Sequence, residues 1–200
     1  LTTYTTGDYM TLDAATRRNL ELTQTIRGRS VRGSLLGVID QTITPMGGRL
    51  LRHWVSRPLL DIARLERRLD TVEALFVDGT LRAQVREALK NIADLERLTN
   101  RLVTRNASPR ELISLKQTLQ QVPVLRALLI GQAQALKALA YDLDPADDVV
   151  DLIERAIVDD PPATLNNIGV IRRGYSPELD QLVQDSDDAR RYINSLERVE

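Results

Sequence analysis

Cysteine is absent from the 200-residue sequence, and histidine occurs once, at position 53. Without cysteine there are no disulfide frameworks or thiolate metal sites, and one histidine cannot complete the usual zinc site or a Ser-His-Asp or Cys-His catalytic set. Aromatic residues amount to only 4% of the chain, which leaves little material for stacking nucleic-acid bases. The missing thiols fit a reducing compartment, so we expect the cytoplasm.

Neither sign of charge is in excess, because 27 Lys and Arg residues are matched by 28 Asp and Glu residues. A uniformly basic nucleic-acid-binding surface is therefore not expected. The basic side chains form small clusters at Arg27, Arg29 and Arg32, at Arg172 and Arg173, and at Arg190 and Arg191. The longest apolar runs, such as residues 124–130, fall far short of the roughly 20 residues of a membrane helix. We expect no membrane partner and no secretory leader.

Helical signals recur along the whole chain, whereas β-strand signals are scarce. We therefore expect an all-α fold of ordinary helices joined by short loops. Helix starts are predicted from capping residues at Asp13, Ser34, Thr44 followed by Pro45, and Ser108 in the capping box Ser-Pro-Arg-Glu. The helix after Thr44 must end before Pro58. After Ser108 the spacing predicts one buried stripe formed by Leu112, Leu115, Leu119 and Val122.

The segment TPMGGRLLRHWVSRPLLD, residues 44–61, contains the only tryptophan and the only histidine. On a helix its apolar residues share one face: Leu50, Leu51, Trp54 and Val55. We interpret Trp54 as a core anchor and His53 as a solvated or hydrogen-bonded structural residue. Gly47 and Gly48 predict close approach by another backbone. The segment is therefore expected to be scaffold and not a catalytic site.

Two units are predicted along the chain. Residues 1–165 form a helical core domain, and residues 166–200 form a connector and the start of a long helix. The boundary falls within residues 158–176, which are rich in Pro, Asn, Gly and Asp and indicate an irregular connection. The helix after Ser176 has the 3.5-residue repeat of a coiled coil at Leu179, Leu182, Ser186, Ala189, Ile193 and Leu196. We expect it to continue beyond Glu200 and to find its partner helix there.

The segment DDVVD, residues 147–151, is the sharpest indication of an enzyme. Asp147, Asp148 and Asp151 match the aspartate-rich Mg²⁺-diphosphate motif of isoprenoid synthases, which are also all-α. However, Asp144 and Pro145 are placed to cap this helix, and acids in a first turn favour the positive end of the helix dipole. No second aspartate-rich helix has the same spacing. We therefore interpret these acids as helix-start residues.

Five blocks occur in an order that resembles the MutS family of DNA mismatch-repair proteins: LDAATRRNLEL (12–22), GSLLGVIDQTITPMGGRLLRHWVSRPLLD (33–61), RLDTVEAL (68–75), DLERLTNRLV (94–103) and SPRELISL (108–115). They resemble its central core, or lever, domain over nearly the whole chain. The tail, residues 169–200, resembles the passage into the helix that climbs toward the DNA clamp. The family-signature residues that we interpret as structural are Asp13, Thr16, Asn19, Leu20, Asp40, Thr44, Gly47, Arg49, Leu51, Trp54, Pro58, Asp94 and Arg97.

The resemblance implies a helical lever that couples ATPase domains to a DNA clamp, without base reading or catalysis of its own. No cofactor is expected in this chain, since the phosphate loop that would bind ATP and Mg²⁺ in the full-length protein is not in it. The implied partners of that protein are mismatched duplex DNA, a second subunit in a homodimer, and MutL. Arg190 and Arg191 are candidates for contact with the DNA backbone. The alternative is a stand-alone helical adaptor that binds a partner helix through the coiled-coil stripe.

Overall fold

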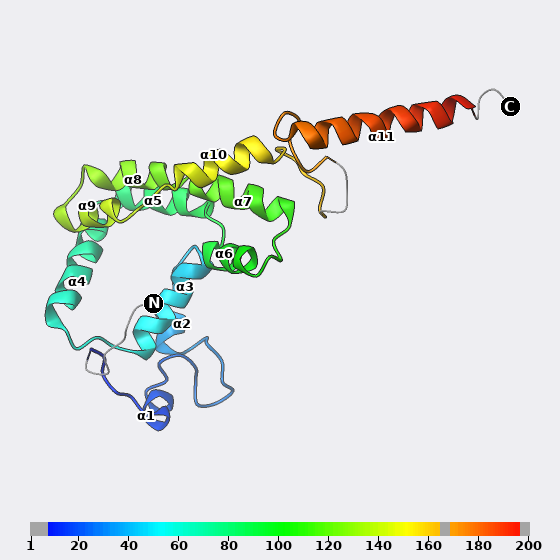
Figure 1. Ribbon diagram of the computed structural model, residues 1–200. Coiled ribbons are helices and arrows are strands. Elements are labelled where there is room, and N and C mark those ends of the chain that lie inside the picture. Colours follow the sequence, from blue (N-terminus) through cyan, green and yellow to red (C-terminus); the bar gives the residue numbers. More distant parts are fainter. Residues whose placement is uncertain (1–7, 165–168, 197–200) are drawn as a thin grey trace.

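The computed structural model describes residues 8–164 and 169–196, and its regular structure is helical (Figure 1). The only strand-like pairings in this described part are two isolated bridges, between Tyr9 and Leu59 and between Ile157 and Ile171. The predicted all-α fold is confirmed. The helices are α1 (Ala14–Asn19), α2 (Leu35–Ile39), α3 (Pro45–Ser56), α4 (Ile62–Val77), α5 (Gly79–Lys90), α6 (Leu95–Val103), α7 (Pro109–Leu119), α8 (Val122–Ile130), α9 (Gln134–Tyr141), α10 (Asp147–Ala156) and α11 (Pro177–Leu196).

The predicted helix starts follow from side-chain caps. Asp13 accepts a hydrogen bond from the backbone N–H of Thr16, and Ser34 does the same for Gly37. Thr44 caps α3, which ends at Ser56 as Pro58 requires. Ser108 forms the full capping box with Glu111 at the start of α7. These four starts are confirmed.

The helical body contains two small cores. One lies among α4, α5, α8 and α9, where the buried residues are Leu81, Leu129, Leu136 and Ala140. The other lies among α6, α7 and α10 and extends to the segments around the bridge after α10, with the buried residues Leu98, Ile113, Leu115, Ile153, Ala156, Ile157 and Val170. In Figure 1, α5, α7, α8 and α10 lie together, and α4 runs downward from the left-hand end of this group, beside α9.

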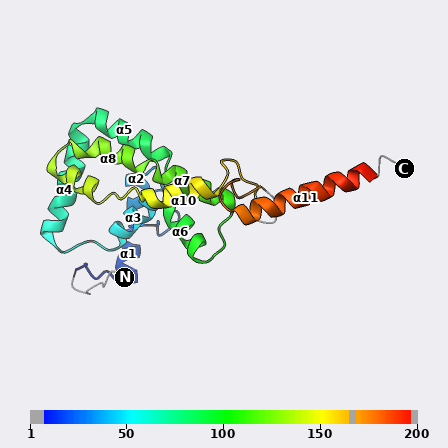
Figure 2. The same cartoon turned by 45° about the horizontal axis from the view of Figure 1, so that its top comes forward.

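The two ends of the chain extend from this body in different ways. The lobe of α1, α2 and α3 hangs below it in Figure 1, with Leu36 almost fully buried inside the lobe. Helix α11 projects away from everything else, and the turned view in Figure 2 shows the same separation. None of the helices in the described ranges combines the length and hydropathy that a membrane span needs.

Two details of the predicted helices are wrong. The stripe predicted from Leu112 to Val122 runs across two helices, because α7 ends at Leu119 and Val122 begins α8. Pro123 follows at the second position of α8; a proline there has no N–H to donate and would clash with the carbonyl four residues earlier in a continuous helix. Asp144 does not cap α10. Its carboxylate accepts from the N–H of Ala146, which is the N-cap in a left-handed conformation.

The packing predicted for residues 44–61 is also partly wrong. Trp54 is only partly buried, and the guanidinium of Arg68 lies 3.8 Å from its ring centroid, so it is covered by a cation and not anchored in a core. Leu50 is 49% exposed. The nearest atoms to a Cβ at Gly47 or Gly48 belong to the side chains of Asp40, Thr42 and Thr44, not to another backbone. The predicted helix is nevertheless present, as α3, and its role as scaffold stays a prediction.

Close backbone approach occurs instead at Gly37, which no sequence pattern singles out. A Cβ built on Gly37 would collide with the carbonyl group of Val31. The residues between them form the tight turn that buries Ser34 and starts α2. A side chain at position 37 would therefore collide with the backbone, so glycine is required there. At Gly47 and Gly48 the nearest atoms belong to side chains, which can move slightly.

Candidate functional site

An ion-pair cluster joins the N-terminal lobe to the helical body. Arg49 on α3 donates from Nη1 and Nη2 to the two carboxylate oxygens of Asp94, at 2.8 and 2.7 Å, and from Nε to Glu96 at 2.7 Å. The fork of the guanidinium matches this planar arrangement, which a lysine could not reproduce. We call Arg49, Asp94 and Glu96 the Arg49 joint. It ties together residues 45 positions apart in sequence.

Asp94 performs two tasks within this joint. Its Oδ1 also accepts from the backbone N–H of Arg97 at 3.1 Å and so caps α6. The hydrogen bonds from Arg49 are the largest cause that lowers the pKa of Asp94 to about 2, and the bond from the Arg97 N–H contributes to the same shift. The same contacts raise the pKa of Arg49. Both groups therefore stay charged at neutral pH.

A second set of charges holds α6 against α7. Arg101 donates from Nε to Glu111, while its Nη2 donates to the carbonyl of Asn106 at 2.6 Å. Glu111 also accepts from the N–H of Ser108, and this bond is the largest cause that lowers the pKa of the Glu111 carboxyl. Arg97, a predicted signature residue, lies 3.7 Å from Glu111. The capping box is thus part of a contact between helices.

The base of α11 is held by a third cluster. Asp159 pairs with Arg172 at 3.1 Å and with Lys116 of α7 at 3.2 Å, and Arg172 is the largest cause that lowers the pKa of Asp159. Arg172 also donates from Nε to the carbonyl of Glu154 at 2.9 Å and from Nη2 to that of Ile157 at 3.1 Å. We call Lys116, Asp159 and Arg172 the Asp159 joint. It fastens the segment that leads into α11 to both α7 and α10.

Helix α11 itself begins as predicted. Ser176 accepts from the N–H of Leu179, and Asp180 accepts from the N–H of Gly174 at 2.7 Å, which closes the turn before the helix. The predicted coiled-coil positions form a surface that is exposed except at the partly buried Ser186. We call it the α11 stripe: Leu179, Leu182, Ser186, Ala189 and Ile193. Leu182 is 66% exposed. The side chain of Leu196, the boundary at residues 165/166 and any continuation past Glu200 lie outside the described residues.

Arg190 and Arg191 are both exposed on α11. Arg191 donates to Asp188 at 2.6 Å, one turn earlier on the same helix. Within the ranges that the structure describes, Arg190 makes no ion pair. Their contact with a DNA backbone stays a prediction.

The other signature residues occupy structural positions. Asp40 accepts from both the backbone and the hydroxyl of Thr42, at 3.0 and 2.7 Å. Gly47 donates its N–H to Thr44, and the carbonyl of Pro58 accepts from Met10 at 2.8 Å. The remaining members are Asp13 and Thr16, which form the α1 cap, Asn19 and Leu20 at the end of α1, and Leu51, which is partly buried on α3. His53 lies edge-on to Tyr9, with ring centroids 6.1 Å apart.

Helix α4 carries an exposed apolar surface that was not predicted. Ile62, Leu65, Leu69, Val72 and Phe76 recur at spacings of three and four, and Phe76 is 77% exposed. We call these residues the α4 stripe. The same 3.5-residue repeat that marks α11 was present in the sequence and predicts it. Exposed stripes of this kind are typical of surfaces that another helix covers.

The arrangement of the acidic side chains at residues 147–151 does not support the enzyme hypothesis. Asp147 and Asp148 lie in the first turn of α10, as expected. In the described part of the chain, no group of three or more acidic or histidine side chains is arranged to hold a metal ion. The isoprenoid-synthase interpretation of Asp147, Asp148 and Asp151 therefore has no support beyond the motif.

Comparison with known proteins gives one consistent family. A sequence model described as MutS domain III matches residues 15–199. The protein named DNA mismatch repair protein MutS from Pelotomaculum thermopropionicum is 46% identical over 199 residues, 98% of this chain and 23% of that protein. Those of the same name from Ruminiclostridium cellulolyticum and Symbiobacterium thermophilum are each 44% identical, over 97% and 100% of this chain. The chain spans less than a quarter of the length of these relatives.

Proposed function

Because the chain belongs to the MutS domain III family, we propose that it is the helical lever of a mismatch-repair protein, which couples ATPase domains to a DNA clamp. The observation that carries the proposal is the Asp159 joint. Through this joint, the base of a helix that projects into open space is fastened to two helices of the body. A displacement of the body would therefore be passed to α11.

The build of the chain supports rigid transmission. Close-packed helices move as units, and coupling between distant sites requires a contiguous element that has two arrangements of similar free energy. The Arg49 joint connects the N-terminal lobe to α6, the Glu111 contacts connect α6 to α7, and the Asp159 joint connects α7 to the start of α11. Helices α6 and α7 link these three groups of ion pairs, which together connect α3 to the segment before α11.

The remaining roles belong to the longer protein that the proposal implies. Binding of mismatched duplex DNA, ATP and Mg²⁺, formation of a homodimer and recruitment of MutL would use other parts of it. This chain would contribute no base reading and no catalysis. A protein that repairs the bacterial chromosome would act in the cytoplasm. The exposed α4 and α11 stripes support this division of labour, since both are surfaces that other helices of a larger protein can cover.

The lever is tested by breaking the Asp159 joint in the longer protein. Arg172→Gln removes the ion pair with Asp159 and weakens the bonds to the two carbonyl groups. The factor by which ATP changes the affinity for mismatched duplex should fall toward one, while ATP and DNA each bind separately as before, because only the coupling free energy is lost. Fluorescence anisotropy of a labelled mismatched duplex, with and without ATP, measures this factor.

Arg173→Gln is the matched control, because Arg173 is exposed beside Arg172 and makes none of the hydrogen bonds of the joint. It should leave the coupling factor at its wild-type value. If Arg172→Gln also leaves it there, the lever proposal is contradicted. The helical adaptor, which would use the α11 stripe to bind a partner helix, then becomes the better interpretation.

A further inference from the structure

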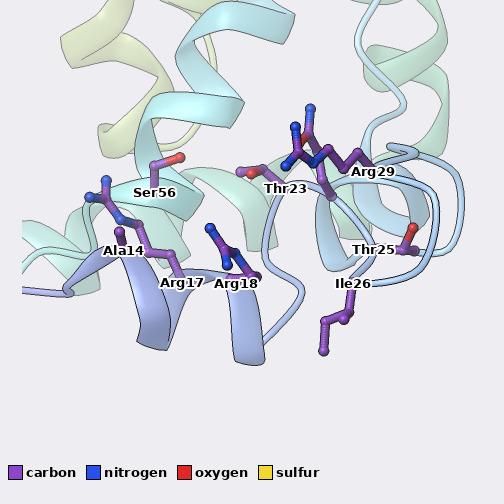
Figure 3. Close-up of a pocket in the computed structure, with 9 residues that line it drawn as sticks. Ala14, Arg17, Arg18, Thr23, Thr25, Ile26, Arg29 and Ser56 are labelled. Carbon is purple, nitrogen blue, oxygen red and sulfur yellow. The ribbon is translucent and has the colours of Figure 1, made fainter.

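A hollow of about 600 Å³ lies between α1, the loop before α2 and the end of α3, and none of its lining residues belongs to the joints described above. Figure 3 shows Arg17 and Arg18 rising from α1 and Arg29 reaching in from the loop toward Thr23. Every lining residue is neutral or basic: Ala14, Arg17, Arg18, Thr23, Gln24, Thr25, Ile26, Arg29 and Ser56. Three guanidinium groups therefore share one concave surface without an acidic side chain among its lining residues.

These arginines are not neutralised by ion pairs. In the parts of the chain that the structure describes, no carboxylate lies within ion-pair distance of Arg17, Arg18 or Arg29. The nearest acids in sequence have other partners. Asp13 accepts from the N–H of Thr16 and interacts electrostatically with Arg17, and Glu21 accepts from the N–H of Ile26 at 2.7 Å. The guanidinium groups of Arg18 and Arg29 are thus available to a ligand from outside the chain.

The loop that carries Arg29 is held in place by its own hydrogen bonds. The N–H of Thr25 donates to the carbonyl of Ser30 at 2.9 Å, and the N–H of Ser30 donates back to the hydroxyl of Thr25 at 3.3 Å. Gly28 and Arg29 both have positive φ, of 94° and 50°. An arginine rarely adopts this conformation, and such strained backbone persists where the surrounding structure fixes it, often at functional sites. The backbone at Arg29 is therefore held in place before any ligand arrives.

We propose that this hollow is a binding site for a phosphate group, with Arg18 and Arg29 as its principal ligands and Arg17 as a third. Guanidinium groups bind phosphate oxygens with paired, charge-assisted hydrogen bonds. The hydroxyl groups of Thr23 and Ser56 add neutral donors of the kind that phosphate accepts from. The hollow is open to solvent, so it suits a phosphate that remains attached to something larger. The source is either the backbone of nucleic acid or a free phosphorylated molecule.

The alternative explanation for Arg17 and Arg18 is stabilisation of the C-terminal end of α1. Basic residues in a last turn favour the negative end of a helix dipole. Helix α1 has only six residues, however, and Arg29 belongs to no helix. The dipole explains neither why Arg29 faces the same hollow nor why its lining residues include no acid.

The test uses the 200-residue chain with two probes, a short labelled DNA duplex and inorganic pyrophosphate. The double variant Arg18→Gln with Arg29→Gln should bind the preferred probe at least about tenfold more weakly, because two charge-assisted contacts are lost. If the probe is the duplex, the slope of log affinity against log salt should fall in magnitude by about 2. Arg29→Lys keeps the charge but not the planar guanidinium, so its affinity for the probe should fall between those of the wild-type chain and the double variant.

The matched control is Arg27→Gln with Arg32→Gln, which removes the same charge from the same segment but from residues outside the hollow. It should reduce affinity far less. Duplex binding that depends on Arg18 and Arg29 identifies the nucleic-acid backbone, and pyrophosphate binding alone that depends on them identifies a free phosphorylated molecule. Equal losses in the two double variants, or no binding of either probe by the wild-type chain, would overturn the proposal. Neither result depends on the lever, which is tested separately through Arg172.

Discussion

Asp94 is a signature residue that forms both a local helix cap and a contact between distant parts of the chain. The single carboxylate of Asp94 caps α6 and also accepts two hydrogen bonds from the guanidinium of Arg49 on α3. Its cap was not among the predicted helix starts, although aspartate before an amphipathic helix is a start signal that the sequence contains. The partner on α3 has no such signal, because nothing in the sequence gives the orientation of α3 relative to α6.

The Arg49 joint should make stability depend on pH in the acid range. The folded-state pKa of Asp94, about 2, lies below its ordinary value of 3.8. The contribution of the joint is therefore complete above about pH 4 and is lost as pH falls toward 2. We expect Arg49→Gln to lower the melting temperature at pH 7, and the difference from wild type to narrow between pH 4 and pH 2. Thermal melts followed by circular dichroism at stepped pH measure this.

Arg57→Gln provides the control for this prediction, because Arg57 is exposed at the end of the same helix and has no ion pair in the described part of the chain. It should leave both the melting temperature and its pH dependence close to wild type. A melting difference for Arg49→Gln that stays constant from pH 7 to pH 2 would show that the joint does not titrate through Asp94.

At the scale of single helices, the caps are the part of the fold that the sequence predicts best. A cap needs only residues within one turn, and Asp13, Ser34, Thr44 and Ser108 all act as expected. Errors arose where a boundary depends on backbone shape. Ala146 occupies the N-cap position of α10 in a left-handed conformation that alanine rarely adopts, and no residue pattern predicts it.

The capping box of α7 gives a prediction for one helix. Ser108→Ala removes the side-chain acceptor for the first turn and should lower the free energy of unfolding by about 1 kcal/mol. Chemical denaturation followed by circular dichroism measures the change. Ser186→Ala is the control, since it makes the same replacement inside α11, where alanine is the better helix former. An equal loss of stability in both variants would mean that the capping interaction is not the cause.

At the scale of the whole molecule, one of the two apolar stripes was predicted and the other was not. The α11 stripe was expected from its spacing, whereas the α4 stripe was overlooked, although it has the same spacing. A repeat of apolar residues says that a helix has a buried or bindable face, but not whether this chain covers it. Trp54 illustrates the converse error, because a large apolar side chain was expected in a core and is covered instead by Arg68.

The uncovered stripes should make the isolated chain self-associate. We expect sedimentation velocity to show a species heavier than the 22.5 kDa monomer that increases with protein concentration, because contiguous exposed apolar surface favours association. Leu182→Glu together with Ile193→Glu should shift the equilibrium toward monomer. Asn194→Glu, on the neighbouring polar position of α11, should not. A wild-type chain that stays monomeric at high concentration would contradict the prediction.

The projection of α11 has a geometric consequence. Its 20 residues span about 30 Å at 1.5 Å per residue. A tilt of about 10° at the base would therefore sweep the far end through roughly 5 Å, about the length of one helical turn. The Asp159 joint lies close to the pivot, where a salt bridge a few tenths of an ångström longer would correspond to ångströms of travel at the tip.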